Sequence, residues 1–283
     1  MTITRPLSLE MDYSAITLYD IAPNSSDDLH DHSDFYQISI PLIGHPTMQC
    51  NQETRLVRDQ QRLVLSPGYQ HRHFAGEESV RMLLLFFHRE LLERVATDRF
   101  ERPSGSIEFS PWGEGTTDGF RKLAESAIRQ TIQRPFEQLE LQETEWELAT
   151  LLLSLQKGTH TPGTYTPGTY TSSPAAHHPS MKRVLEFIHE QADSEVTLDH
   201  LTAEAGLSKF HLIRLFREHT GTTPSQYVNE LRITRAASLM TRTTDDLTRI
   251  AFEVGFGSFS TFERVFKKKY GVTPRDFRKN QNP

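Results

Sequence analysis

Two arginines, Arg214 and Arg264, lie 50 residues apart at matching places of two similar segments. A guanidinium group can donate two parallel hydrogen bonds to O6 and N7 of guanine, which gives roughly 1–3 kcal/mol of discrimination between bases. On the same helix face as Arg214 lie Phe210 and Ile213, which could contact thymine methyl groups. These residue types at this spacing indicate a surface that reads the major groove of DNA, unless the two apolar residues are exposed by chance.

The segments around these arginines repeat one pattern of helix, turn and helix. The shared positions of the first copy are Leu198, Leu201, Gly206, Leu207, Ser208, Phe216, Gly221, Pro224 and Tyr227. Those of the second copy are Leu247, Ile250, Gly255, Phe256, Ser258, Phe266, Gly271, Pro274 and Phe277. The offset changes from 49 to 50 residues at Gly257, which is the single inserted residue. A unit that places one helix against DNA, present twice, predicts contact with two stretches of one duplex.

Residue types also separate the inner from the outer face of the second helix in each copy. The residues expected to pack inward are Leu212, Leu215, Phe216, Phe262, Val265 and Phe266. Besides the residues already named, the outer faces carry Ser260, Thr261 and four cations, Lys209, Arg217, Lys267 and Lys268. We interpret these four cations as phosphate contacts, which supply affinity and register without reading sequence. Glu263 lies at the edge and fits either a cytosine contact or an ordinary surface charge.

Hydroxyl residues mark where the helices of this region begin. Thr197, Ser208 and Ser258 each precede a helical pattern and are expected to cap it. Thr223–Pro224 combines a capping threonine with proline at the first helical position. A long helix over residues 225–241 is therefore predicted to join the two copies.

The net charge of −6 hides an asymmetry between the two ends of the chain. Residues 1–180 have 15 basic and 24 acidic residues, a net of −9, whereas residues 181–283 have 16 and 13, a net of +3. From Lys209 onward the chain has 14 basic and 7 acidic residues. Two differently charged domains are implied, and the basic one suits a polyanionic partner.

Composition excludes several classes of protein. A chain of 283 residues is long enough for about two domains. No run approaches the ~20 apolar residues of a membrane span, and no secretory signal is visible. A lone cysteine, Cys50, excludes an intrachain disulfide and fits a reducing compartment. We therefore expect a cytoplasmic protein without a membrane partner.

The front half changes from strand-like to helical patterns. Residues 14–88 contain short alternating segments and an apolar run at residues 80–87, which predict a small β-barrel or sandwich. Helical spacing follows over residues 89–157, and the broad apolar stripe of its last helix suits either packing on the barrel or a dimer interface. Residues 158–180 are dense in proline and glycine, which predicts a flexible linker.

The C-terminal third resembles the AraC/XylS family of bacterial transcription regulators. The resemblance covers residues 181–280 and is carried by residues 201–216, 250–256 and 262–274. It implies that one long helix holds both recognition helices on one side of the DNA, in adjacent major grooves. It also implies six base-reading positions, which fall on Phe210, Ile213, Arg214, Ser260, Thr261 and Arg264.

Residues 10–100 resemble, more weakly, a cupin-type sensory domain. Metal-binding cupins use two histidines spaced by one, a nearby carboxylate and a third histidine, for which the candidates here are His30, His32 and His71. The carboxylate position falls near Tyr36 or Gln37, so no metal or other cofactor is expected, although these histidines stay open candidates. The alternatives are an organic effector pocket lined by His32, Tyr36, His71 and His73, and histidines that only bond within the barrel.

The predicted organisation is therefore α+β. It comprises a cupin-like, effector-binding β-barrel over residues 1–100, a helical extension for dimerisation over 101–157, the linker over 158–180 and an all-α domain with two helix-turn-helix units over 181–283. The predicted function is an effector-controlled DNA-binding regulator, an activator by resemblance, and not an enzyme. Its expected partners are promoter DNA, a small molecule, a second copy of the chain and, by resemblance, RNA polymerase. The alternative is a metal-dependent cupin enzyme fused to a DNA-binding domain.

Overall fold

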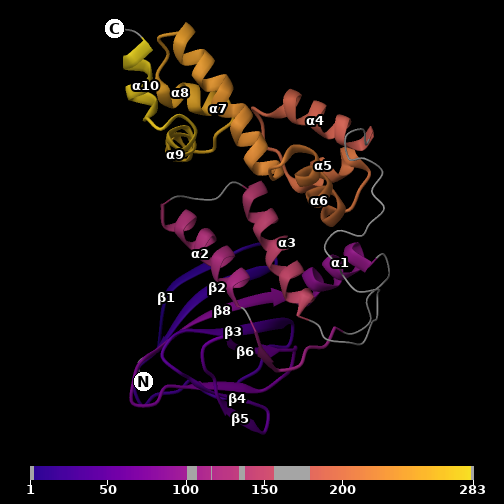
Figure 1. Ribbon diagram of the computed structural model, residues 1–283, viewed down its shortest axis with the longest axis vertical. Coiled ribbons are helices and arrows are strands. Elements are labelled where there is room, and N and C mark those ends of the chain that lie inside the picture. The colour runs from indigo at the N-terminus through magenta and orange to yellow at the C-terminus, as the bar shows by residue number, and fades with distance from the viewer. Residues whose placement is uncertain (1–2, 101–106, 116, 134–137, 156–178, 282–283) are drawn as a thin grey trace. The chain divides into compact units, whose positions relative to one another are not determined.

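The structure, a computed structural model, describes residues 3–100, 107–115, 117–133, 138–155 and 179–281 (Figure 1). It divides into two compact units, one within Met1–Thr131 and Thr144–Tyr165, the other within Ile132–Glu143 and Thr166–Pro283. The first unit is rich in strands and the second is helical, which confirms the α+β class. The predicted linker lies outside the described residues except for Pro179 and Ser180, which belong to a helix instead.

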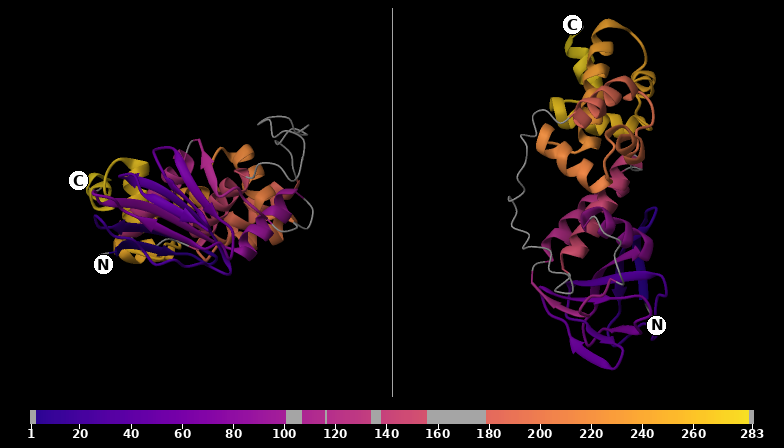
Figure 2. Two further views of the ribbon diagram at one scale, coloured as in Figure 1. Left: turned by 90° about the horizontal axis from the view of Figure 1, so that it is seen from below. Right: turned by 90° about the vertical axis from the view of Figure 1, so that its right-hand side faces the viewer.

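The described strands of the first unit form two antiparallel sheets. A six-stranded sheet has the order β1-β2-β8-β3-β6-β9 and a three-stranded sheet the order β5-β4-β7. The strands are β1 (Ile3–Glu10), β2 (Ser14–Ile21), β3 (Phe35–Ile43), β4 (Thr47–Cys50), β5 (Glu53–Leu56), β6 (Gln61–Leu65), β7 (His71–Phe74), β8 (Val80–His88) and β9 (Trp112–Glu114). In the left-hand view of Figure 2 the long strands run side by side.

Strand β1 was not predicted from the sequence. It pairs only with β2, at the edge of the larger sheet, and most of its side chains are exposed or half-exposed. An edge strand with little apolar surface to bury gives no alternating signal, because its stability comes from backbone hydrogen bonds to its neighbour.

The two sheets share one core, to which side chains contribute from alternate positions of each strand. Buried apolar residues that face this core include Tyr19, Met48, Leu63, Leu65, Val80, Met82 and Leu84. The opposite face of the larger sheet buries a second set, among them Ile16, Ile38, Ile40, Leu83, Leu85 and Phe87. This arrangement agrees with the predicted small barrel and leaves its outer face for helices.

Three helices follow in the chain, α1 (Arg89–Phe100), α2 (Asp118–Gln133) and α3 (Gln138–Ser154). Figure 1 shows α2 and the part of α3 that belongs to the first unit, residues 144–154, beside the larger sheet. The broad apolar stripe of α3 is buried within this single chain, with Trp146, Leu148 and Leu152 at 6%, 0% and 0% exposure. Of the two uses expected for that stripe, the structure supports packing within the chain.

The second unit contains seven further helices among the described residues. They are α4 (Pro179–Gln191), α5 (Leu198–Ala205), α6 (Lys209–Thr220), α7 (Pro224–Arg242), α8 (Leu247–Glu253), α9 (Phe259–Tyr270) and α10 (Pro274–Gln281). Helices α5 and α6 form the first helix-turn-helix, and α8 and α9 form the second. Helix α7, with 19 residues, joins them as predicted. None of the described helices is both long enough and apolar enough to cross a membrane.

Two residues fix the turn between α4 and α5 to the second helix-turn-helix. Arg232 of α7 is 3% exposed and donates to the carbonyl oxygens of Ala192 and Ser194, at 2.6 and 2.9 Å. Gly255, after α8, has φ +99°, and a Cβ there would lie 2.6 Å from the oxygen of Ala192 and 2.8 Å from Cα of Asp193. The backbone of this turn therefore packs directly on position 255, where only hydrogen fits.

Replacing Gly255 with alanine is expected to lower the free energy of unfolding by at least ~2 kcal/mol. The added methyl group overlaps rigid backbone atoms, and the positive φ is itself costly for any residue with a Cβ. The urea midpoint of the full chain, followed by far-ultraviolet circular dichroism, measures the effect.

The matched control is Gly257→Ala. Gly257 is exposed, and a Cβ there meets no atom within 4 Å. This variant should stay within about 0.5 kcal/mol of the parent. Equal losses at Gly255 and Gly257 would contradict the packing described for the turn.

Candidate nucleic-acid interface and barrel interior

The first helix-turn-helix has the local geometry that its sequence predicts. The side chain of Thr197 caps α5 by accepting from the backbone N–H of His200. Gly206 ends that helix with φ +66°, a left-handed conformation that glycine adopts without strain. Ser208 then caps α6 by accepting from the N–H of His211. The turn therefore fixes where α6 begins and which residues form its first turn.

The predicted cations of α6 differ in how they are held. Lys209 is 18% exposed, with Nζ 2.8 Å from Oδ1 of Asp199. Arg214 is 40% exposed and lies 3.9 Å from Glu218, one turn further along. Arg217 is exposed and Phe210 is half-buried. Arg214 and Arg217 are therefore more exposed to a polyanion than Lys209, which is held by its carboxylate partner.

Ile213 departs from the predicted outer face of α6. It is only 8% exposed and is buried together with Leu212 and Phe216. Residues three or four apart share one side of a helix, so Ile213 and Phe216 lie on the same side. Because the apolar stripe of α6 is broad enough to include position 213, helical spacing alone assigned this residue to the wrong face.

The second helix-turn-helix repeats the arrangement. Asp246 caps α8 through a 2.8 Å contact from the N–H of Thr248, and Ser258 caps α9 by accepting from the N–H of Thr261. Ser260 and Arg264 are half-exposed on α9.

The exposed cations of α9 continue this surface. Lys267 and Lys268 are exposed and, together with Glu263, Arg264 and Thr273, line a surface hollow of ≈ 480 Å³. Lys269, one residue on, turns back toward α7, with Nζ 3.0 Å from Oγ1 of Thr234. The exposed positive charge is therefore concentrated on Arg264, Lys267 and Lys268.

Thr261 is a second departure from the predicted base-reading set. It is 2% exposed, and its hydroxyl lies 3.0 Å from Oγ of Ser258. Ser258 caps this first turn of α9, and Thr261 directly precedes the core residue Phe262. Its buried side chain thus stabilises the first turn of α9 through the contact with Ser258.

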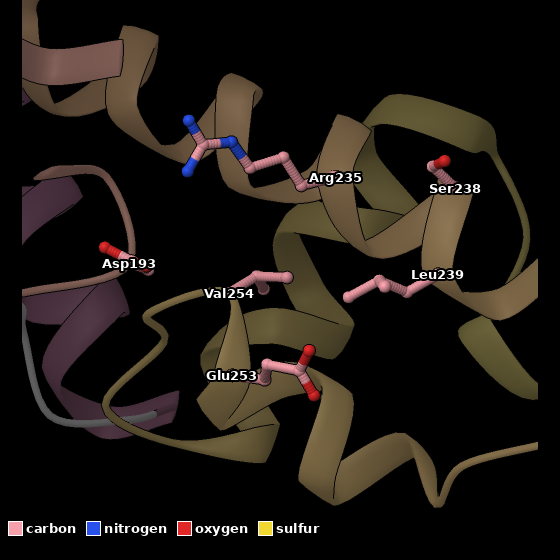
Figure 3. Close-up of a pocket in the computed structure, with 6 residues that line it drawn as sticks. All are labelled: Asp193, Arg235, Ser238, Leu239, Glu253 and Val254. Carbon is pink, nitrogen blue, oxygen red and sulfur yellow. The ribbon is translucent and has the colours of Figure 1, made fainter. Parts of the chain in front are cut away.

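A separate hollow of ≈ 370 Å³ lies where α7, α8 and the α4–α5 turn meet (Figure 3). Leu239 and Val254 point toward each other across it, and Asp193, Arg235 and Glu253 supply charges of both signs at its rim. Its lining includes no residue of α6 or α9, so it does not belong to the basic surface.

The barrel interior contains a polar network around His73. Nδ1 of His73 lies 2.8 Å from Oδ2 of Asp27, and Oδ1 of Asp27 accepts from the backbone N–H of His73. On its other side, Nε2 of His73 lies 3.1 Å from Oγ of Ser39, to which Gln37 also donates. His73 and Asp27 are 1% and 7% exposed, so both ring nitrogens are satisfied by buried protein groups.

Electrostatics agree with an ionised Asp27 in this network. Burial alone would raise the pKa of Asp27, but the hydrogen bonds with His73 outweigh it and lower the pKa. Burial and the adjacent Asp27 raise the pKa of Tyr19, whose hydroxyl lies 3.2 Å from Oδ2 of that residue. Nothing in the local sequence marks Asp27, Ser39 or Gln37 as members of this network, because folding brings them to His73 from other segments of the chain.

Tyr36 does not join this interior, in contrast to the prediction. Its hydroxyl donates to the carbonyl of Ile107 at 2.7 Å, and its ring packs edge-on against Phe109. On β3 the neighbouring residue Gln37 faces the core instead, because side chains alternate along a strand. The predicted effector set thus retains His32, His71 and His73 on one side of the sheet.

His30, His32 and His71 come together, with one ring nitrogen of each within 4.8 Å of the others. Burial, and next the nearby charge of His73, lowers the pKa of His71 to about 3. Burial also lowers the pKa of His32. The imidazoles of His71 and His32 are therefore neutral near pH 7.

Comparisons with known proteins concern mainly the second unit. Residues 201–280 match a family model described as a helix-turn-helix domain. The regulatory protein SoxS of Salmonella typhimurium is 32% identical over 103 residues, which are 36% of this chain and 96% of SoxS. The HTH-type transcriptional regulator MtrA of Neisseria gonorrhoeae is 31% identical over 34% of this chain and 32% of MtrA.

The matches cover the relatives to different extents. The matched region spans about a third of the length of MtrA and of the activator RhaS of Salmonella schwarzengrund. The crystal structure of an AraC-type regulator from Chromobacterium violaceum is similar over 37% of this chain and 93% of that one, at 28% identity, with a TM-score of 0.35 that supports no further conclusion. Nevertheless, this chain covers nearly all of SoxS, and both helix-turn-helix copies have their caps and a basic second helix. The chain therefore belongs to the AraC/XylS family of transcription regulators.

Proposed function

We propose that the chain regulates transcription by placing α6 and α9 in successive major grooves of one duplex. The observation that carries this proposal is the pair of capped, basic helices joined by the single helix α7. At 1.5 Å per residue, the 19 residues of α7 span about 28 Å, close to the ~34 Å repeat of B-DNA. A rigid connector of this length suits two helices that enter neighbouring grooves on one side of the duplex.

The residues of this interface fall into two groups by their chemistry. Phe210, Arg214, Ser260 and Arg264 are the base-reading residues of the proposal, with Ile213 and Thr261 supporting them from the buried side. Lys209, Arg217, Lys267 and Lys268 bind phosphates, and for Lys209 this requires release from Asp199.

The first unit, in this proposal, binds a small-molecule effector inside the barrel. Supporting it are three buried polar atoms without a hydrogen-bond partner among the described residues: Nε2 of His32, Nε2 of His71 and Oε1 of Gln37. Buried polar groups are nearly always paired, so a polar ligand suits this interior. The ligand must bind one state of the protein better than another, since equal affinity would shift nothing.

Further parts of the proposal rest on family membership. We infer activation rather than repression, because the relative RhaS is named a transcriptional activator. Contact with RNA polymerase follows from that role, as does a cytoplasmic location with the promoter. A homodimer remains part of the proposal, on a surface other than the buried stripe of α3. The relatives are regulators, and we propose the same of this chain rather than an enzyme.

Footprinting of promoter fragments with the purified full chain, with and without a pool of small metabolites, tests the proposed function. We expect protection of a discrete operator covering two adjacent major grooves, with an occupancy that the effector changes. Protection without any sequence preference at low ionic strength would refute the regulator, and occupancy indifferent to every metabolite would refute the effector.

Replacing Arg214 or Arg264 with alanine should cost roughly 1–3 kcal/mol of operator binding and relax base choice at two positions about one helical turn apart. The reason is the loss of one bidentate contact in each groove. Selection from randomised operators measures both effects. Arg249→Ala is the control, since Arg249 is 70% exposed on α8, outside the two recognition helices. An equal loss on every sequence would make the two arginines phosphate contacts.

Replacing Lys267 with alanine should weaken binding to all sequences alike and lower the slope of log K against log salt by about one. An exposed lysine on a phosphate releases about one counterion when it binds. Titrations at several salt concentrations give the slope. Lys122→Ala, an exposed lysine of α2, should leave it unchanged. A parental slope in Lys267→Ala would remove this residue from the interface.

A further inference from the structure

The cluster of His30, His32 and His71 is built by the backbone. His30 and His71 form an isolated antiparallel bridge, in which each N–H donates to the other's carbonyl, at 3.1 and 2.8 Å. This reciprocal pair brings two imidazole rings to a centroid distance of 4.3 Å. His32, two residues after His30, adds a third ring at 5.1 and 5.2 Å from the other two. The close approach is therefore fixed by main-chain pairing and does not depend on flexible side chains alone.

The hydrogen bonds of the His30 and His71 rings leave one nitrogen of each available to a ligand. Nδ1 of His30 lies 2.7 Å from the carbonyl oxygen of Asp28, and Nδ1 of His71 lies 3.1 Å from that of Tyr69. A carbonyl can only accept, so each Nδ1 carries the proton and each Nε2 has a lone pair. Metal-binding histidines are usually oriented by such a bond from the second ring nitrogen.

Two of the Nε2 atoms are also buried without a partner. Neither Nε2 of His71, a residue 1% exposed, nor Nε2 of His32 has a hydrogen-bond partner among the described residues. His73, two residues from His71, has both ring nitrogens paired, as described above. The barrel thus contains one fully bonded histidine, His73, and a separate cluster in which His32 and His71 each have an unpaired Nε2.

We propose that His30, His32 and His71 bind one divalent transition-metal ion, with zinc as the best match. Imidazole nitrogens suit zinc and its neighbours in the first transition row, whereas calcium and magnesium prefer oxygen ligands. Zn–N bonds of about 2.0–2.1 Å place tetrahedral ligands about 3.4 Å apart. The nitrogens, within 4.8 Å of one another, reach this spacing through small rotations of the half-exposed His30 and His32 rings.

The cluster supplies three protein ligands. Among the described residues, no carboxylate or thiolate joins the three histidines in this cluster. Three protein ligands leave a fourth position for water or a donor atom of a small molecule. The proposal concerns this cluster alone and holds whether or not an organic effector also enters the barrel.

Zinc binding to the full chain, without an affinity tag, tests the proposal. Calorimetric titration with ZnCl₂ should show one equivalent bound, and Co²⁺ should give the visible absorption of a nitrogen-ligated site. His30→Ala and His32→Ala should each weaken zinc binding by more than about 10-fold, since even loss of an outer-shell partner costs 10- to 100-fold. The control is His45→Ala, an exposed histidine outside the cluster, which should bind zinc like the parent.

Thermal unfolding provides a second readout, which can be used even where a variant is less stable than the parent. Zinc should raise the unfolding temperature of the parent and of His45→Ala, because an ion that binds only the folded state stabilises it. The same concentration should leave His32→Ala and His71→Ala unshifted. Absence of zinc binding to the parent, or unchanged binding in His32→Ala, would overturn the proposal. Neither result bears on operator binding by α6 and α9, which footprinting tests separately.

Discussion

The burial of Arg232 is the constraint on which the geometry of the second unit depends. A buried guanidinium is costly unless its donors are satisfied, and here the carbonyls of Ala192 and Ser194 accept from it. Its guanidinium carbon also lies 5.7 Å from the ring centroid of Phe256 in the second helix-turn-helix. Because Arg232 belongs to α7, it ties the α4–α5 turn, the connector and the second copy together. The position of the α4–α5 turn on α7 and the second copy is therefore set by a buried charge as well as by apolar packing.

Much of this unit could be predicted from sequence because its determinants are local. A serine or threonine cap and a glycine at the left-handed turn act within a few residues of the helix ends that they define, so the limits of α5, α6, α7 and α9 follow from the chain itself. The faces of Ile213 and Thr261 were wrong for the opposite reason. Each stands beside a core residue, at the boundary of a stripe whose width depends on what packs against it.

In the strands of the barrel, too, the local sequence predicted the element but not which of its faces is buried. The short alternating segments within residues 14–88 correctly predicted strands such as β3, but not which side of β3 faces the shared core. With a period of two, an error of one residue exchanges the faces, and Gln37 rather than Tyr36 belongs to the interior. The partners of His73 come from Asp27 and Ser39, which are 46 and 34 residues away in sequence. Such pairs depend on the pairing of whole strands, which no local pattern encodes.

His71 and His73 both face inward from β7, but their ring nitrogens differ in how many protein partners they have. In β7, His73 is bonded to Asp27 and Ser39, so replacing a protein partner by a ligand would leave a buried charge or hydroxyl unpaired, at a cost of about 1–3 kcal/mol or more. His71 carries no such penalty, since its Nε2 has no partner among the described residues. A ligand of the barrel, whether an ion or an organic molecule, gains most where it satisfies an atom that the protein leaves unsatisfied. The energetics therefore favour binding at His71 with His30 and His32, while the hydrogen bonds between Asp27 and His73 fix the position of β7.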